Sequence, residues 1–457
     1  MKKTELLSPA GNLKNLRYAF SYGADAVYAG QPRYSLRVRN NDFNDVNNLA
    51  IGINEAHALG KQFYLAVNLF PHNSKLKTFL ADMEEVISLK PDALIMADVG
   101  LIMMVREKWS EMPIHLSVQA NTMNYAAVKF WQSAGISRII LSRELSLDEI
   151  AEIRQQCPDM ELEVFVHGAL CIAYSGRCLL SGYINHRDAN QGTCTNSCRW
   201  EYKVHPAQET AGGDIQKIAP QNPQIHQETT TQWRPLPDLG EGEPTDGLYL
   251  IEEMGRPNEL MPIFEDEHGT YIMNSKDLRA IQHVQRLTEM GINSLKIEGR
   301  TKSYYYVART AQVYRQAIDD AVAGRPFDKK LMDELENLAS RGYTEGFYRR
   351  HVHDEYQNYQ NGSSVGELQQ FVGEVLAREG NWLKVDVKNH FRVGDTLELL
   401  SPTGNRSFIL TQLHNLKREN INAALGSGYV VYVFVPNAAE LENVEKCLLI
   451  RYLVKQP

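Results

Sequence analysis

The sequence predicts an α/β fold, a (β/α)8 barrel of the TIM type followed by a small antiparallel β-barrel domain at the C-terminus. Three observations support this prediction. Short apolar runs alternate with amphipathic helical segments between residues 5 and 297. The runs are continuous, as expected for parallel strands buried on both faces. No G-x-G-x-x-G motif follows the first run, which disfavours the alternative of a doubly wound open sheet.

The expected barrel strands are eight apolar runs. They cover residues 5–7, 26–28, 63–67, 93–96, 114–118, 138–141, 162–166 and 294–297. The expected helices cover residues 12–22, 46–59, 75–88, 100–109, 126–134, 147–156, 275–290, 303–323 and 329–339. Glycine follows several of these segments, as in Tyr22-Gly23 and Met290-Gly291, and commonly marks the end of a helix.

Changes in composition predict the domain limits. The barrel is expected at residues 1–350, with a cysteine-cluster loop at 168–200 and a polar insertion at 202–248. Residues 248–275 are expected to return to the barrel, with short strands at 249–251 and 271–273. A polar segment at 354–366 predicts a linker. Residues 366–457 then show a β pattern, with strands expected at 382–387, 396–400 and 429–435.

The composition is that of an ordinary globular protein. The 457 residues are 43% hydrophobic and 23% charged, enough for a large core and two domains. The N-terminal MKKTELLSPAG lacks the apolar stretch of a signal peptide, and no apolar run is long enough to span a bilayer. We therefore expect a cytoplasmic protein with no membrane partner. The net charge of −8 means that an RNA partner needs a local basic patch.

A cysteine cluster dominates the loop after the seventh expected strand. Cys171, Cys178, Cys194 and Cys198 follow the spacing C-x6-C-x15-C-x3-C in a polar, glycine-rich segment. Thiolates at this density suit zinc or an iron–sulfur cluster, and the spacing matches neither zinc ribbons nor ferredoxins. Ordinary buried cysteines are the alternative, which the polar loop disfavours, and disulfides are less expected in a chain with no sign of secretion. The two remaining cysteines, Cys157 and Cys447, are expected to be core residues.

Polar side chains follow almost every expected barrel strand. Because the C-terminal ends of barrel strands carry the chemistry in this fold, these residues predict the mouth of a site. The predicted catalytic residues are His167 and Glu298, after the seventh and eighth strands. Asn68 and Asn121, after the third and fifth strands, are predicted to bind substrate.

Basic residues flank two neighbouring strand ends. Arg33, Arg37 and Arg39 follow the second strand, and Lys296 and Arg300 flank the end of the eighth. Arginine binds carboxylates and phosphates with two parallel hydrogen bonds, so these residues predict a site for an anionic small molecule such as an organic acid, for an RNA backbone, or for one of each. A solvated rim is the alternative reading, and it suits the neighbouring Lys302 well.

Long motifs in the chain resemble one known family. They are ELLSPAG, GADAVYAG, NDFN, LSVQAN, LSRELSL, FVHGALC, YIMNSKDL and SLKIEGR. Together, from Glu5 to Phe347, they resemble the collagenase-like peptidase family U32. Several members of that family are linked to oxygen-independent hydroxylation rather than to proteolysis.

The resemblance implies a specific function. It implies a tRNA-modifying enzyme that forms 5-hydroxyuridine at the wobble position without oxygen and depends on prephenate or a similar small organic acid. It also implies a [4Fe–4S] cluster on Cys171, Cys178, Cys194 and Cys198, and an electron-transfer partner is compatible with it. Two alternatives stay open: a non-catalytic RNA-binding or scaffold protein with a structural cluster, and a peptidase. The sequence has no H-E-x-x-H, and a nucleophile built from Cys171 and His167 leaves three thiols unexplained.

Overall fold

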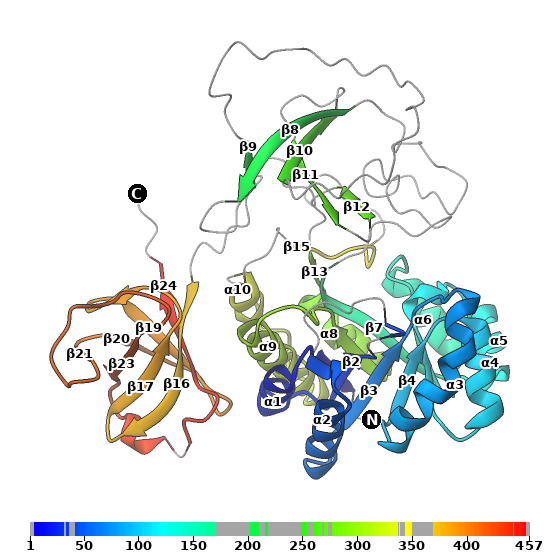
Figure 1. The fold of residues 1–457 in the computed structure, drawn as a ribbon, viewed down its shortest axis with the longest axis horizontal. Coiled ribbons are helices and arrows are strands. Elements are labelled where there is room, and N and C mark those ends of the chain that lie inside the picture. The colour runs from blue at the N-terminus through cyan, green and yellow to red at the C-terminus, as the bar shows by residue number, and fades with distance from the viewer. Residues whose placement is uncertain are drawn as a thin grey trace.

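The computed structural model describes most of the chain (Figure 1). The described residues are 4–31, 33–35, 42–169, 202–209, 215–217, 248–253, 260–266, 269–272, 277–336, 338, 343–349, 369–441 and 443–453. The predicted Arg37, Arg39 and four clustered cysteines lie outside these ranges.

The N-terminal part is a closed parallel barrel, which confirms the predicted fold class. Its strands run in the order β14-β1-β2-β3-β4-β5-β6-β7, and pairing between β7 and β14 closes the ring. Each strand matches one of the eight apolar runs. They are β1 (Glu5–Pro9), β2 (Ala26–Gly30), β3 (Gln62–Val67), β4 (Ala93–Met96), β5 (Ile114–Leu116), β6 (Arg138–Ile140), β7 (Glu161–Gly168) and β14 (Ser294–Ile297).

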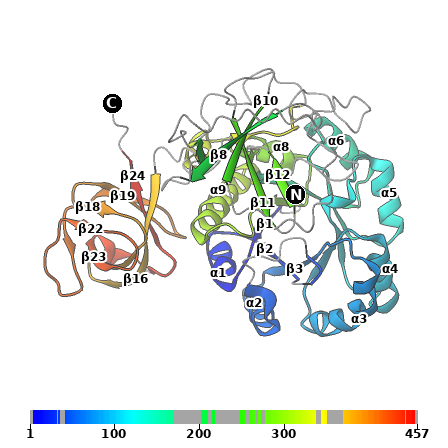
Figure 2. The same cartoon turned by 45° about the horizontal axis from the view of Figure 1, so that its top comes forward.

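Helices surround the barrel strands, as Figure 2 shows. Several begin at a side chain that accepts a hydrogen bond from a backbone N–H of the first turn, including Asn12, Asp98 and Ser303. Ser146 and Glu149 form a complete capping box at the start of α6. The helices are α1 (Leu13–Ser21), α2 (Val46–Ala58), α3 (Asn73–Ser88), α4 (Val99–Lys108), α5 (Tyr125–Ser133), α6 (Leu147–Gln156), α8 (Val284–Glu289), α9 (Tyr304–Val322) and α10 (Lys330–Glu336).

The helix expected at 275–290 is shorter than its sequence pattern indicates. Residues Asp277–Arg279 form strand β13, which pairs antiparallel with the end of β7, and only Val284–Glu289 is α-helical. The reason is that β7 extends to Gly168, beyond the barrel rim, and leaves backbone groups that need partners. β13 supplies them at Gly168 and His167, and β15 (Tyr343–Thr344) pairs with β13 in turn.

The expectation that residues 248–275 return to the barrel is wrong. β10 (Leu248–Glu253), β11 (Leu260–Asp266) and β12 (Gly269–Ile272) join β8 (Tyr202–Glu209) and β9 (Ile215–Lys217) in a separate antiparallel sheet. Its order is β12-β11-β10-β8-β9, and it lies beyond β13 and β15 (Figure 1). Because β7 pairs directly with β14, the closed barrel has no free edge for these strands.

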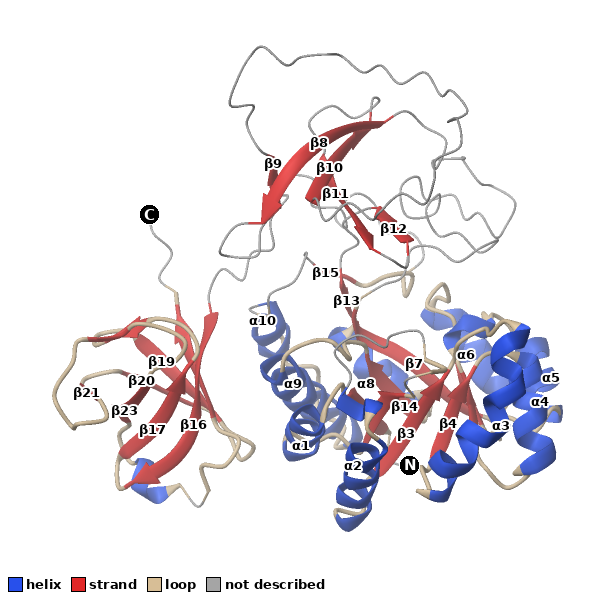
Figure 3. Cartoon of the chain, in the orientation of Figure 1, coloured by secondary structure: helices blue, strands red, loops and turns tan. Residues whose placement is uncertain are grey.

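The C-terminal domain is an antiparallel half-barrel with its own apolar core, made of a bent seven-stranded sheet and a separate pair of short strands (Figure 3). Cys447 lies in that core, and Cys157 lies in the core of the barrel, as predicted. The strands are β16 (Gln369–Glu379), β17 (Trp382–Val387), β18 (Phe391–Arg392), β19 (Thr396–Leu400), β20 (Arg406–Ile409), β21 (Leu413–His414), β22 (Ala423–Ala424), β23 (Val430–Phe434) and β24 (Leu448–Tyr452).

Buried polar contacts attach this domain to the barrel helices. Arg309 of α9 is fully buried and donates to Glu398 of β19 at 2.9 Å. Glu374 of β16 accepts from Tyr18 of α1 at 2.9 Å and from Tyr304 of α9 at 3.2 Å. These directional contacts fix how the domain sits on α1 and α9. None of the described helices is both long and apolar enough to cross a membrane.

Candidate functional site

The barrel interior holds a connected set of charged side chains. Arg138 of β6 forms ion pairs with Glu5 of β1 at 2.7 Å and with Glu161 of β7 at 2.9 Å. It also lies 3.3 Å from Glu163 of β7, which accepts a hydrogen bond from Lys296 of β14 at 2.8 Å. Since buried charges are tolerated only when paired, these contacts constrain how β1, β6, β7 and β14 meet.

Lys296 connects this network to aromatic rings nearer the mouth. Its Nζ lies 4.3 Å from the ring centre of Tyr28 and 5.4 Å from that of Phe165. Burial lowers the pKa of Lys296, and the neighbouring Glu163 carboxylate opposes that shift. The lysine is therefore a buried cation whose charge depends on Glu163.

Glu298 lies directly after β14, above this layer. Its carboxylate accepts from the backbone N–H of Gly299 at 3.1 Å and from the Tyr28 hydroxyl at 3.4 Å. Arg143, after β6, donates to the other carboxylate oxygen at 3.4 Å. The Arg143 guanidinium also stacks on Phe165, with Cζ 3.7 Å from the ring centre. Glu298 thus lies between groups from three strands.

Arg300 lies on the Tyr28 side of the same region. Its Nη1 donates to the Ser35 hydroxyl at 2.8 Å, and its Cζ lies 5.8 Å from the Tyr28 ring centre. A Cβ on Gly30 would lie 2.5 Å from the Arg300 guanidinium, so the glycine at the end of β2 leaves the space that the arginine occupies. The predicted residues Lys296, Glu298 and Arg300 therefore come together around Tyr28.

Two family models match the chain. The model described as Peptidase family U32 matches residues 11–358, and that of the Peptidase family U32 C-terminal domain matches residues 367–451. The chain belongs to peptidase family U32.

Relatives within this family carry RNA-related names. The tRNA hydroxylation protein P of Escherichia coli K12 is 65% identical over 443 residues, 96% of both chains. The protein of the same name from Haemophilus influenzae Rd is 62% identical over 455 residues, 99% of this chain and 97% of that one. A 23S rRNA 5-hydroxycytidine synthase of E. coli is 28% identical over 413 residues, 87% of this chain and 52% of the relative.

In this U32 barrel, the His167 side chain packs against aromatic rings and not against the charged groups around Glu298. Its ring packs against Tyr306 and Tyr314 of α9 and Tyr343 of β15, with centroids 5.5–5.8 Å apart. Its Nδ1 lies 3.3 Å from the Tyr314 hydroxyl. Burial, with help from the charges of Arg279 and Lys302, lowers the pKa of His167 to about 3. The imidazole is thus neutral at ordinary pH and faces the helix layer.

The backbone at His167 nevertheless contacts the site. The His167 carbonyl accepts from the backbone N–H of Glu298 at 2.8 Å. The next residue, Gly168, has a φ of +98°, and a Cβ there would lie 2.2 Å from the Glu298 carbonyl oxygen. The last described residues before the cysteine loop are therefore packed directly against Glu298.

The other predicted binding residues are dispersed. Arg33 turns to α3, where its Nη1 lies 2.8 Å from Asp82 and its side chain is half exposed. Asn121 has left-handed backbone with a φ of +53°, and its side-chain oxygen accepts from Ser142 at 3.2 Å. Asn68 directly follows β3 and is half-buried. Arg33 is thus directed away from Arg300. The strands that they follow, β2 and β14, are not neighbours as predicted, because β1 lies between them and pairs with both.

Sequence reasoning missed several residues that complete the site. In the sequence, Arg143 belongs to a polar segment that follows the sixth strand, Ser142-Arg143-Glu144, and nothing in that segment distinguishes it from its neighbours. Glu163 and Tyr28 lie inside runs that were expected to be apolar strands. A charged residue in the middle of an otherwise apolar strand is the signal that could have identified Glu163, since such a charge needs a partner inside the barrel.

The four clustered thiols lie in the stretch between β7 and β8 that the structure does not describe. Among the described residues, no group of three or more His, Cys, Asp or Glu side chains could hold a metal ion. The donor set itself, four cysteines within one loop, has the chemistry that zinc or an iron–sulfur cluster requires.

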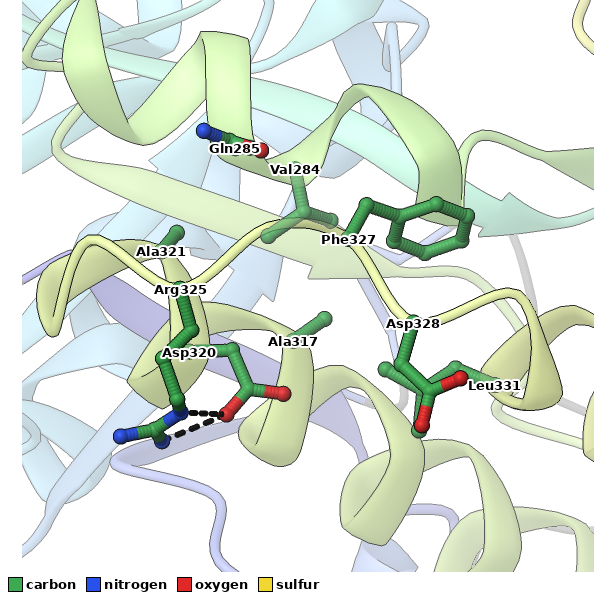
Figure 4. A pocket seen from close by; sticks show the side chains of 9 residues that line it. All are labelled: Val284, Gln285, Ala317, Asp320, Ala321, Arg325, Phe327, Asp328 and Leu331. Atoms are coloured by element: carbon green, nitrogen blue, oxygen red, sulfur yellow. Dashed lines mark hydrogen bonds and ion pairs between the residues drawn. The ribbon is translucent and has the colours of Figure 1, made fainter.

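A small crevice lies between α8, α9 and the segment that follows α9 (Figure 4). It is lined by Val284 of α8, Ala317 and Asp320 of α9, and residues from Arg325 to Leu331. Arg325 forms an ion pair with Asp320 at 2.5 Å on one side of it. No predicted site residue lines this crevice, so it is separate from the charged groups around Glu298.

Proposed function

We propose that this U32 protein hydroxylates tRNA, forming 5-hydroxyuridine at the wobble position without molecular oxygen. The main support is its 65% identity, over 96% of both chains, to a tRNA hydroxylation protein. A second relative is named as the synthase of a hydroxylated cytidine in rRNA. Both relatives are named for hydroxylation of RNA, and this favours an enzyme over the alternative of a non-catalytic scaffold protein. We assign the reaction to the cytoplasm, where its substrate is found.

The chemistry requires a second substrate. Replacing the C5–H bond of uridine with a C5–OH bond is a two-electron oxidation of the base. Without O2, another molecule has to provide the oxygen atom and accept the two electrons. We assign both roles to prephenate or a similar small organic acid, whose C–OH bond becomes a C–H bond as the C–H bond of the base becomes C–OH. This exchange balances in atoms and electrons, and a separate electron-transfer partner is needed only if water supplies the oxygen.

The residues around Tyr28 fit these two substrates. The guanidinium of Arg300 is suited to bind a carboxylate of the acid with paired charge-assisted hydrogen bonds. Glu298 is suited to hold the proton that leaves C5, because its carboxylate lies at the strand ends between Tyr28 and Arg143. His167 acts as a positioning residue in this proposal, since its backbone carbonyl holds the Glu298 N–H.

Cys171, Cys178, Cys194 and Cys198 are the proposed ligands of one [4Fe–4S] cluster. When bound, such a cluster supplies one-electron transfer or a Lewis-acidic iron. The proposal rests on the four-thiol donor set and on family membership. The cysteine loop starts at a fixed point beside the site, because Gly168 packs against the Glu298 backbone.

The proposed tRNA substrate can present its wobble base at the barrel mouth. Bases of an anticodon loop are largely accessible, so inserting one into a pocket costs less than opening a duplex. The chain has a net charge of −8, so binding has to depend on local Lys and Arg side chains and should weaken steeply with salt.

Complementation of the E. coli relative tests the proposed function. An E. coli strain without its tRNA hydroxylation protein P is grown without air and given this chain, and its tRNA nucleosides are quantified by mass spectrometry. We expect 5-hydroxyuridine derivatives to return with the unaltered chain and to be absent with Glu298→Gln. Failure of the well-expressed unaltered chain to restore them refutes the proposal. Restoration by Glu298→Gln retains the function but removes the assigned role of Glu298.

A further inference from the structure

We propose that Arg143 is a second anion-binding residue at the barrel mouth, and that it acts with Arg300 on a compact organic acid with two carboxylates. The inference rests on the proposed function, which requires a small acid at this mouth. It extends that function by assigning the acid's second carboxylate to a residue from a different strand.

The surroundings of Arg143 leave donor capacity unused. Its side chain is 10% exposed, and its guanidinium stacks on the Phe165 ring, with Cζ 3.7 Å from the ring centre. Its Nε is buried and has no hydrogen-bond partner among the described residues. Its one ion pair within that part of the chain is the 3.4 Å contact with Glu298, which is long for a charge-assisted hydrogen bond.

A buried guanidinium with an unpaired Nε and one long ion pair favours binding of an additional anion. Guanidinium carries five N–H donors, and removing them from water is costly unless they are paired. Glu298 also accepts from Gly299 and Tyr28, so its negative charge is shared among several donors. A carboxylate placed against Arg143 would supply the hydrogen bonds that Glu298 alone does not.

Arg300 is placed to hold the other end of the same molecule. It is buried, and its Nη1 donates to the Ser35 hydroxyl at 2.8 Å. Tyr28 connects the two arginines, because its hydroxyl lies 3.4 Å from Glu298 and its ring centre lies 5.8 Å from the Arg300 Cζ. Two cationic groups therefore flank one carboxylate and one aromatic ring at the mouth.

Burial favours a small acid over an RNA backbone as the ligand. The phosphates of a nucleic acid are usually bound by exposed cations along a surface, whereas Arg143 and Arg300 are each about nine-tenths buried. Lys296 lies beneath them, but its charge is balanced by Glu163 at 2.8 Å. Two buried guanidinium groups on either side of Glu298 and Tyr28 therefore favour a compact acid with two carboxylates.

Glu298 gives the inference a distinctive consequence. Its negative charge lies against Arg143 and opposes the entry of a second anion. Replacing it with Gln retains an oxygen that can accept from Gly299 and Tyr28 but removes that charge. Glu298→Gln should therefore bind the acid more tightly while losing hydroxylation, a combination that structural damage does not produce.

Calorimetric titration of the purified full-length protein tests the inference, with prephenate, pyruvate and inorganic phosphate as probes. We expect the unaltered protein to bind prephenate more tightly than the other two. Arg143→Lys and Arg300→Lys should each weaken prephenate binding by about 10- to 100-fold, toward the affinity for pyruvate, because lysine retains the charge but loses the paired hydrogen bonds. Arg286→Lys, at an exposed ion pair with Asp148, is the control and should bind like the unaltered protein.

Three results would overturn the inference. They are prephenate binding by Arg143→Lys equal to that of the unaltered protein, weaker prephenate binding by Glu298→Gln, and equal affinity of the unaltered protein for phosphate and prephenate. Unfolding temperatures of all variants show whether each is folded. The titration does not depend on tRNA, so restored hydroxylation with no prephenate binding refutes this inference alone. Prephenate binding that depends on Arg143, without hydroxylation, refutes only the proposed function.

Discussion

The ammonium group of Lys296 lies 2.8 Å from the carboxylate of Glu163 inside the barrel, and both side chains are almost completely buried. The two residues are 133 positions apart in the chain and lie on the two strands that close the ring. A buried ion pair adds little to the net stability of a fold, because burying both charges costs free energy. Losing one partner is destabilising, because it leaves the other charge buried without compensation. The closure of the barrel and the electrostatics of its mouth therefore depend on the same contact.

Glu163→Gln should destabilise the protein by about 3–5 kcal/mol, because it leaves the Lys296 ammonium buried without its counter-charge. The free energy of unfolding from urea denaturation measures this. The double variant Glu163→Gln/Lys296→Met should lose less than the sum of the two single variants, since it removes both charges. Asp148→Asn, at an exposed ion pair with Arg286, should cost less than about 1 kcal/mol. Strict additivity of the two core changes would show that the pair is not coupled.

Stability should fall in acid partly because of His167. Its pKa is about 3 in the folded protein and about 6.5 in an unfolded chain, so between these values the unfolded state binds more protons. The stabilising contribution is complete above about pH 6.5 and is lost as the pH falls toward 3, by on the order of a few kcal/mol.

His167→Gln should therefore show a smaller loss of unfolding temperature between pH 7 and pH 4 than the unaltered protein. His115, whose pKa burial also lowers, retains part of the dependence. An identical profile for His167→Gln would show that the imidazole is not responsible.

Gly168→Ala should be more damaging than a change at an unconfined glycine. Gly60 also has a positive φ, +65°, but a Cβ there has nothing within 4 Å, so Gly60→Ala should cost about 1–2 kcal/mol from backbone conformation alone. At Gly168 the Cβ also collides with the Glu298 carbonyl, so the end of β7 has to move. Urea denaturation compares the two variants, and equal losses would show that the close approach carries no cost.

Iron content should depend on four cysteines and not on the other two. Replacing Cys171, Cys178, Cys194 or Cys198 with Ala should each lower the iron and sulfide bound by protein purified without air. Cys157→Ala and Cys447→Ala are the controls, because both thiols are buried in apolar cores. Metal analysis and the visible absorption spectrum measure the outcome. Stoichiometric zinc, or equal iron in all variants, would contradict the ligand assignment.

The sequence by itself determined the elements of the barrel. All eight strands lie where continuous apolar runs predict them, and most helices lie within a few residues of their amphipathic segments. These patterns are local, because each strand or helix repeats its own periodicity and ends at its own capping or turn residues. For the same reason the sequence could place Lys296 in the last strand of the barrel, and Glu298 and Arg300 directly after it.

Tertiary structure decided which of those side chains meet. The register between β7 and β14 shifts between Lys296 and Ile297, so that one extra residue of β7 lies between Phe165 and His167. Such a bulge changes the alternation of side chains along the strand. In agreement with this, Phe165 contacts Lys296 and Arg143, whereas His167 packs against α9. Similarly, Arg33 is drawn to Asp82 on α3, and the ring closure excludes residues 248–275. Contacts of this kind depend on residues far apart in the chain, which no local pattern specifies.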